Sequence, residues 1–288
     1  MSDRTTAPVV YPAYDNLLAE RRGTRLFITL NRPEARNAIT HEMMRDIGAV
    51  LELAAVDDES RVVVLRGAGG NFSAGGDLNA MQNMPPAPPA GEPDPMVEHY
   101  RYFGDVLVEL NRLPKPVIAV VEGGAAGGGF GMACCADVTI IQRDAKFALP
   151  EARVGFIPSQ ILPFIARRIG SGQLRRLVVL GERITAEDAF NLGVGHFLTD
   201  DRAATGRQLQ HCLDLLDLCD PAAVRAAKAV VLASDTEPLL DVLDDAAARL
   251  VGLLRRPEAP AGMQAFLNKQ PPPWAAEAQR LNSANGGD

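Results

Sequence analysis

The sequence is poor in the features that mark metal centres, disulfide scaffolds, nucleic-acid surfaces and membrane spans. Its 288 residues include four cysteines, Cys134, Cys135, Cys212 and Cys219, and no two of them form a C-x-x-C pair. Cys134 and Cys135 fall in an apolar stretch, which favours buried free thiols over metal ligands or disulfides.

Charge, hydropathy and histidine spacing exclude further classes of partner. The net charge is −7 and no run of lysine and arginine occurs, so nucleic acid is not expected as a partner. Because the chain has no apolar run of about 18 residues and no apolar segment at its start, we expect a cytoplasmic protein without membrane association. The histidines lack metal-ligand spacing, which argues against a metal site.

Two glycine-rich turns are the main positive signal. The first is 72–78 (FSAGGDL) and the second is 123–129 (GGAAGGG), and each follows a β-branched run, at 61–66 and 117–121. Such turns at the ends of neighbouring strands can direct two backbone N–H groups at one point. The second turn also leads into an apolar helix, whose dipole favours negative charge. This geometry suits an oxyanion, such as an enolate or a tetrahedral intermediate.

The sequence gives less support to the other functions that glycine-rich turns can have. Each turn alone is also consistent with an ordinary strand-to-helix connection. A dinucleotide site would need glycine where Met132 stands, and the first acidic residue, Asp137, follows too soon to bind a ribose. A phosphate-binding loop would need Gly-Lys-Ser/Thr, which does not follow the turn.

Four motifs in a fixed order resemble the enoyl-CoA hydratase/isomerase (crotonase) superfamily over about residues 20 to 270. They are 30–38 (LNRPEARNA), the two glycine turns and 147–158 (FALPEARVGFIP). The resemblance implies an α/β fold: a crotonase (ClpP-like) spiral of ββα units with a C-terminal helical appendage. It further implies acyl-CoA thioesters as substrates, no cofactor beyond the coenzyme A of the substrate, and a homotrimer or homohexamer.

The chain divides into three predicted regions: a disordered lead over 1–13, the crotonase-fold core over 14–200, and a helical region over 201–288. In the family, the helical region forms trimer contacts and covers the active site. Local patterns predict a hairpin ending at 25–30, helices over 41–55 and 96–112, strands at 138–141 and 146–149, and a helical pattern from 171 onward. Thr40 is the expected N-cap of the first helix. The proline-rich segment 84–95 is either a mobile connection or a lid.

The resemblance assigns catalysis to Glu151 as acid/base and to the backbone N–H groups of Gly76 and Gly128 as the oxyanion hole. Many family hydratases carry another glutamate, and that position is Gly131 here. A single carboxylate can isomerise a double bond, or it can add water if other groups orient that water. Ser159 and Gln160 are candidates for this role, although Ser159 is equally suited to cap the following helix.

The resemblance also implies a coenzyme A site. It places the backbone around Ala35 and Arg36, together with Ala74, Asp77 and Leu78, near the adenine and pantetheine. Phe266 and Lys269 match family positions in the C-terminal segment. A lysine alone is normally a solvated surface charge, whereas at this motif position it would pair with a phosphate of coenzyme A.

We therefore expect an enoyl-CoA hydratase. The run 147–170 and the preceding GGGFG are similar to the branch that hydrates 3-methylglutaconyl-CoA or isohexenylglutaconyl-CoA, in which an arginine would meet the extra carboxylate. Arg153, Arg167 and Arg168 lie nearby in sequence, but the sequence singles out none of them. The alternatives are a Δ3,Δ2-enoyl-CoA isomerase that uses Glu151 alone and a weakly catalytic CoA-binding subunit.

Overall fold

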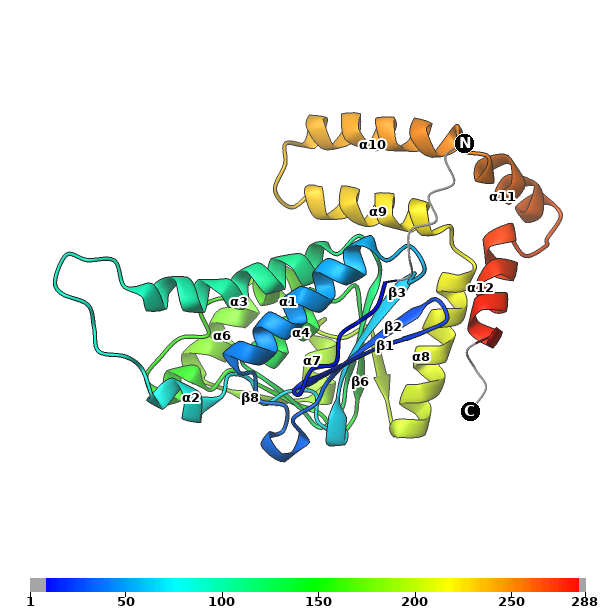
Figure 1. Ribbon diagram of the computed structural model, residues 1–288. Helices are drawn as coiled ribbons and strands as arrows, with labels where there is room; N and C mark the ends of the chain where they lie inside the picture. The colour runs from blue at the N-terminus through cyan, green and yellow to red at the C-terminus, as the bar shows by residue number, and fades with distance from the viewer. Residues whose placement is uncertain (1–8, 285–288) are drawn as a thin grey trace.

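The computed structural model describes residues 9–284, which form a twisted main sheet with helices on both faces, a small second sheet and a C-terminal run of helices (Figure 1). In the main sheet only β1 runs antiparallel to its neighbour, and the other strands pair in parallel. In spatial order its strands are β1 (Leu17–Arg22), β2 (Arg25–Leu30), β3 (Val62–Gly67), β4 (Val117–Val121), β6 (Val138–Gln142) and β9 (Phe197–Thr199).

The central strands are apolar because both faces of the sheet are covered. In β3, Val63 and Leu65 face the large core beneath α1 and α3, whereas Val62 and Val64 face a smaller cluster that includes Leu213 of α8. Parallel sheets buried on both faces have this near-continuous apolar sequence. The β-branched runs predicted as strands are therefore confirmed.

Local helix signals also agree with the structure. The Thr40 side chain accepts a hydrogen bond from Met43 N at the start of α1, as predicted. The helices of the core are α1 (His41–Val56), α2 (Leu78–Gln82), α3 (Pro95–Arg112), α4 (Gly128–Cys135), α5 (Leu162–Ile169), α6 (Ser171–Leu180) and α7 (Ala186–Asn191). The proline-rich segment forms the loop between α2 and α3, which extends beyond the start of α3 (Figure 1).

The second sheet holds the turns that follow the main strands. Its strands are β5 (Gly124–Ala126), β7 (Lys146–Ala148) and β8 (Arg183–Thr185), with β5 parallel and β8 antiparallel to β7. The successions β1–β2–α1 and β4–β5–α4 are ββα units. The prediction of a purely helical pattern from residue 171 is wrong, because β8 and β9 lie beyond it. Strands of three residues are too short for a two-residue periodicity to reveal.

The ends of the chain pack partly against the core. Residues 1–8 of the predicted disordered lead lie outside the described residues. In the remainder of that lead, Tyr11 donates a hydrogen bond to Asp57 (2.8 Å), so the segment 9–13 belongs with the core. At the other end, Asn282 accepts two hydrogen bonds from Thr24, both 2.9 Å long.

The C-terminal region begins after β9. Helix α8 covers the main sheet, α9 and α10 extend away from it, and α12 returns to α8 (Figure 1). The helices of this region are α8 (Arg202–Asp217), α9 (Pro221–Ala233), α10 (Leu239–Leu254), α11 (Glu258–Leu267) and α12 (Pro273–Ala284). Among residues 9–284, no helix is both long and apolar enough to cross a membrane.

Candidate active site

The two glycine turns meet at the carboxyl ends of β3 and β4, as their positions after neighbouring strands predict. Ser73 of the first turn donates its backbone N–H to Gly124 O (2.9 Å) and accepts from Ala126 N (3.0 Å), and Phe72 N donates to Glu122 O (2.9 Å). These backbone hydrogen bonds hold the turns side by side, so their positions do not depend on flexible side chains.

Asn37 organises the first turn, a role that sequence reasoning missed. Its side chain is fully buried, and its amide donates to Ala68 O (2.9 Å) and Asn71 O (2.7 Å). Its backbone has a positive φ of 56°, a conformation in which asparagine is enriched. Ser73 Oγ in turn donates to Asn37 O (2.8 Å). The available signal was an asparagine in the motif 30–38, just before the predicted helix over 41–55.

Gly76 and Gly128 each present a backbone N–H that has no acceptor within residues 9–284. Ile39 bonds to the residues on either side of Gly76, accepting from Asp77 N (3.0 Å) and donating to Gly75 O (2.7 Å), so Gly76 N–H points away from Ile39. Gly128 is the first residue of α4, where N–H groups lack a partner inside the helix. Both amides are therefore free to receive an oxygen of a ligand.

Glycine is required where the turns touch. A Cβ on Gly75, whose φ is +88°, would lie 2.7 Å from Ala126 O and 3.4 Å from Gly127 Cα. Any side chain there would separate the two turns and would also strain the backbone.

Glu151 lies against the second turn. It begins a short 3-10 helix (Glu151–Val154) after β7, is 8% exposed, and a Cβ on Gly127 would lie 2.5 Å from its Oε1. Its Oε2 is buried without a hydrogen-bond partner among the described residues. Burial raises the pKa of this carboxyl group. A buried carboxylate with a free oxygen and a raised pKa is suited to proton transfer.

At Gly131, where the resemblance would place a second glutamate, the space for a side chain is occupied by Ile161. A Cβ on Gly131 would lie 2.5 Å from Ile161 Cβ and even closer to Ile161 Cγ2. Both residues are buried. The sequence showed that position 131 has no carboxylate, and the structure shows that it also has no room for one.

The structure places Ser159 and Gln160 in the turn before α5. That helix begins at Leu162, and its N-cap, Ile161, provides no side-chain hydrogen bond. The hypothesis that Ser159 caps α5 is therefore wrong, because the helix starts three residues later than Ser159. Ser159 is exposed, and the side chain of Gln160 packs against Gly104 of α3.

The predicted coenzyme A residues near the first turn do lie together. Ala74 N donates to Arg36 O (2.9 Å), Arg36 ends the short 3-10 helix Pro33–Ala35, and Leu78, half exposed, begins α2. Asp77 caps α2 and pairs with Arg32 (3.0 Å). Burial favours protonated Asp77, but the hydrogen bonds from Arg32 and the backbone outweigh it and lower its pKa.

Phe266 and Lys269 are not part of this group within one chain. They lie at the end of α11 and just after it, and Figure 1 shows α11 at the opposite side of the molecule from α2. The Phe266 side chain is 84% exposed. No pattern in the sequence indicates this separation.

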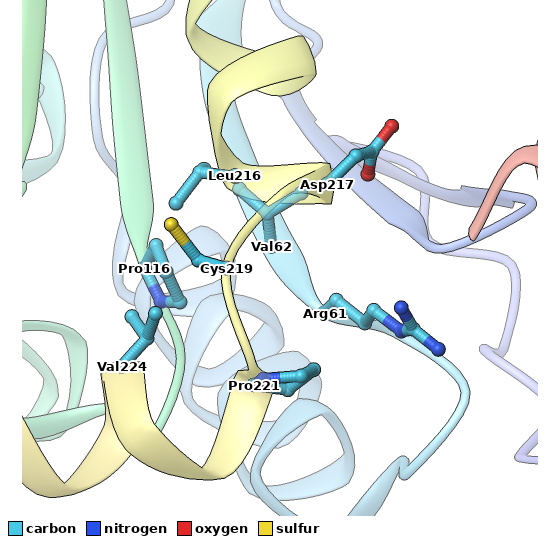
Figure 2. Close-up of a pocket in the computed structure, with 8 residues that line it drawn as sticks. All are labelled: Arg61, Val62, Pro116, Leu216, Asp217, Cys219, Pro221 and Val224. Atoms are coloured by element: carbon cyan, nitrogen blue, oxygen red, sulfur yellow. The ribbon is translucent and has the colours of Figure 1, made fainter. Parts of the chain in front are cut away.

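Two concave features occur elsewhere, at the amino ends of the main strands. Figure 2 shows Arg61, Pro116 and Cys219, which line the first of them. Its volume is about 10 Å³. The second, of about 310 Å³, is lined by Arg225 and Trp274 among others. Both lie at the edge opposite the glycine turns, and the first is too small for an acyl chain. Among residues 9–284, no three potential metal ligands are close enough to share an ion.

Known proteins share this fold and much of this sequence. The family model described as enoyl-CoA hydratase/isomerase matches residues 20–277. The 1,2-epoxyphenylacetyl-CoA isomerase of Escherichia coli K12 is 33% identical over 87% of this chain and 94% of its own. The enoyl-CoA hydratase EchA19 of Mycobacterium tuberculosis is 32% identical over 88% and 94%. The structure of Pseudomonas aeruginosa AtuE is 41% identical, with a TM-score of 0.86 over 91% of this chain and all of that one. The predicted crotonase fold is confirmed.

The contact between Gly131 and Ile161 predicts that a side chain at position 131 destabilises the protein. Gly131→Ala should lower the free energy of unfolding by about 1–3 kcal/mol, because the new methyl group collides with Ile161. In an Ile161→Ala background the same change should cost much less, which urea denaturation of the four proteins would measure. Gly172→Ala in α6, where a Cβ meets open space, is the control and should cost nothing. Equal costs of Gly131→Ala in both backgrounds would contradict the packing.

The raised pKa of Glu151 predicts a pH-dependent effect on stability. The folded pKa lies above the unfolded value of about 4.3, so the native state binds the proton more tightly. The free energy of unfolding therefore falls as pH rises through this interval. Glu151→Gln removes the buried charge, so it should be more stable than wild type at neutral pH, with the difference closing towards pH 4. Thermal unfolding across pH checks this, with exposed Glu92→Gln as control. Lower stability of Glu151→Gln at neutral pH would contradict it.

Proposed function

The chain belongs to the enoyl-CoA hydratase/isomerase family, and from this premise we propose that it hydrates an α,β-unsaturated acyl-CoA thioester. The observation that carries the proposal is the buried, unpartnered Oε2 of Glu151 beside two turns whose Gly76 and Gly128 amides lack acceptors. An acid/base and two preorganised donors are what addition to a conjugated thioester requires.

In the proposed mechanism, the thioester oxygen accepts hydrogen bonds from Gly76 N–H and Gly128 N–H. Glu151 removes a proton from water as the water oxygen bonds to the β-carbon, and the electrons of the double bond move onto the thioester oxygen as an enolate. Glu151 then returns the proton to the α-carbon, which restores the thioester and the carboxylate. The amino end of α4 adds a favourable dipole at the enolate oxygen.

Coenzyme A would bind along the first turn. The backbone of Ala35 and Ala74 and the exposed side chain of Leu78 would contact adenine and pantetheine, and Arg36 would pair with a phosphate. Phe266 and Lys269 are remote in this chain, so in the proposed homotrimer or homohexamer they would contact a thioester bound by another copy. The proposed location is the cytoplasm.

The proposed acyl group is of the glutaconyl type, such as 3-methylglutaconyl or isohexenylglutaconyl. The support is the resemblance of 147–170 and the preceding GGGFG to that branch, together with the glycine at position 131 and the packing of Ile161 against it. With no second glutamate, Ser159, Gln160 or the carboxylate of the substrate itself would orient the attacking water.

A second candidate is Δ3,Δ2-enoyl-CoA isomerisation. The observation that favours it is the same contact, because Ile161 places an apolar surface where a water-binding carboxylate would stand. Glu151 alone can carry a proton between the α- and γ-carbons, and no water takes part.

A panel of substrates separates these functions, and replacing Glu151 tests the acid/base that both of them require. With 2-enoyl, 3-enoyl and glutaconyl-type thioesters, hydration removes the absorbance of the conjugated thioester and isomerisation of a 3-enoyl substrate creates it. Glu151→Gln should lower kcat about 10²–10⁴-fold while acyl-CoA affinity persists. A variant that retains more than about a tenth of kcat would contradict the role of Glu151. A wild-type protein that binds thioesters but changes none would be a binding subunit.

Gly128 allows a matched test of the oxyanion donor. Gly128→Pro removes the N–H at the first position of a helix, which proline tolerates, and should lower kcat about 10²–10³-fold. Gly128→Ala adds similar crowding against Ile39 and Phe103 but keeps the N–H, so it should lose much less. Circular dichroism and light scattering are the controls, and both variants should remain folded with the oligomeric state of the wild type. Equal activities of the two variants would show that this amide does not contact the thioester.

A further inference from the structure

Helix α3 links the candidate oxyanion turn to the start of α5. The ring of Phe103 lies 3.1 Å from the position of a Cβ on Gly128, so this part of α3 borders the proposed thioester site. The next residue, Gly104, is buried, and the amide oxygen of Gln160 lies where its Cβ would stand. Adjacent residues of α3 therefore lie against the proposed thioester site and against Gln160.

Arg101 brings a positive charge to the same place. It precedes Gly104 by three residues, which places the two on one face of the helix. Its Nη1 lies 2.8 Å from the Cβ position on Gly104, where the Gln160 oxygen also lies. The absence of a side chain at Gly104 thus lets a guanidinium group and an amide group approach one point.

Both polar groups retain hydrogen-bonding capacity. Arg101 pairs with Asp105 (2.7 Å) in an i,i+4 contact in which both side chains are about half exposed, and such pairs contribute little stability. Within residues 9–284, no hydrogen bond is made by the Gln160 side chain. A ligand could therefore engage both groups without breaking a buried interaction.

Two of the arginines that lie near Glu151 in sequence, Arg153 and Arg168, are less suited than Arg101 to bind a ligand. Arg168 donates to the carbonyl groups of Cys134 and Ala136 at the end of α4. Arg153 packs against Gly181 and donates to Leu180 O (3.4 Å). Both are directed at protein backbone, unlike Arg101.

We propose that Arg101 and Gln160 form the subsite for a carboxylate at the far end of the acyl group. The thioester would lie at the glycine turns and the acyl chain would pass Phe103. The guanidinium group of Arg101 would donate hydrogen bonds to the terminal carboxylate, and Gln160 would donate through its Nε2–H2 group, because its amide oxygen, which lies against Gly104, can only accept. Arginine provides a planar set of donors that matches a carboxylate. This inference rests on the proposed function and deepens it, since it specifies an acyl group that ends in a carboxylate.

The test compares acyl-CoA pairs of equal length that end in a methyl or a carboxylate group. The measured quantity is the ratio of kcat/KM for carboxylate-ended over methyl-ended 2-enoyl-CoA. Arg101→Gln should lower this ratio about 10- to 100-fold, mainly through the carboxylate-ended substrates. Arg112→Gln, the same change at the other end of α3, is the control and should leave the ratio unchanged. Asp105→Asn removes the competing carboxylate and should raise the ratio.

Calorimetric binding of the saturated acyl-CoA pairs provides a readout that does not depend on turnover. The same order of preference should hold there, with Arg101→Gln losing affinity for the carboxylate-ended ligand alone. An unchanged preference in Arg101→Gln, or an equal loss for both ligands, would overturn the subsite. Failure of the proposed function would differ, because the wild-type protein would then hydrate none of the 2-enoyl substrates, whatever it binds.

Discussion

The hydrogen-bonded contact between the two glycine turns is the constraint on which the candidate site depends. The hydrogen bonds of Ser73 with Gly124 and Ala126 join the carboxyl ends of β3 and β4. The buried side chain of Asn37 fixes the first turn through hydrogen bonds to the backbone just before it. Because a Cβ at Gly75 would meet Ala126 O, this closeness exists only with glycine. Backbone groups held in this way do not have to reorganise when charge develops beside them.

The same arrangement leaves polar groups unsatisfied. The backbone amides of Gly76 and Gly128 have no acceptor among residues 9–284, and the carboxylate of Glu151 is buried with one oxygen unpaired. Each such group opposes folding, and the apolar cores on both faces of the main sheet offset that cost. Unpaired polar groups on adjacent turns, with a raised carboxyl pKa among them, are more typical of a functional site than of a structural network.

Close packing around α4 then limits the chemistry. Ile161 occupies the space beside Gly131, so no side chain fits at that position. On the other side, Gly104 of α3 admits Gln160 and Arg101. The two glycines therefore have different neighbours. The space beside Gly131 is occupied by an apolar side chain, and the space beside Gly104 is occupied by polar side chains. The proposed preference for a carboxylate-ended acyl group follows from this asymmetry.

The sequence by itself determined the long elements and pointed to the residues of the candidate site. The strands β3 and β4, the capped helix α1, the two turns, Glu151 and the absence of a carboxylate at Gly131 all follow from residues adjacent in the chain. Only the tertiary structure decided that Asn37 holds the first turn, that Ser159 caps no helix and that Gln160 packs on α3. It also placed α11, the helix of Phe266, on the opposite side of the molecule from α2 (Figure 1). The reason is physical: periodicity and capping depend on near neighbours, whereas these contacts join residues distant in sequence, and short strands such as β9 form only when the rest of the sheet is there to pair with them.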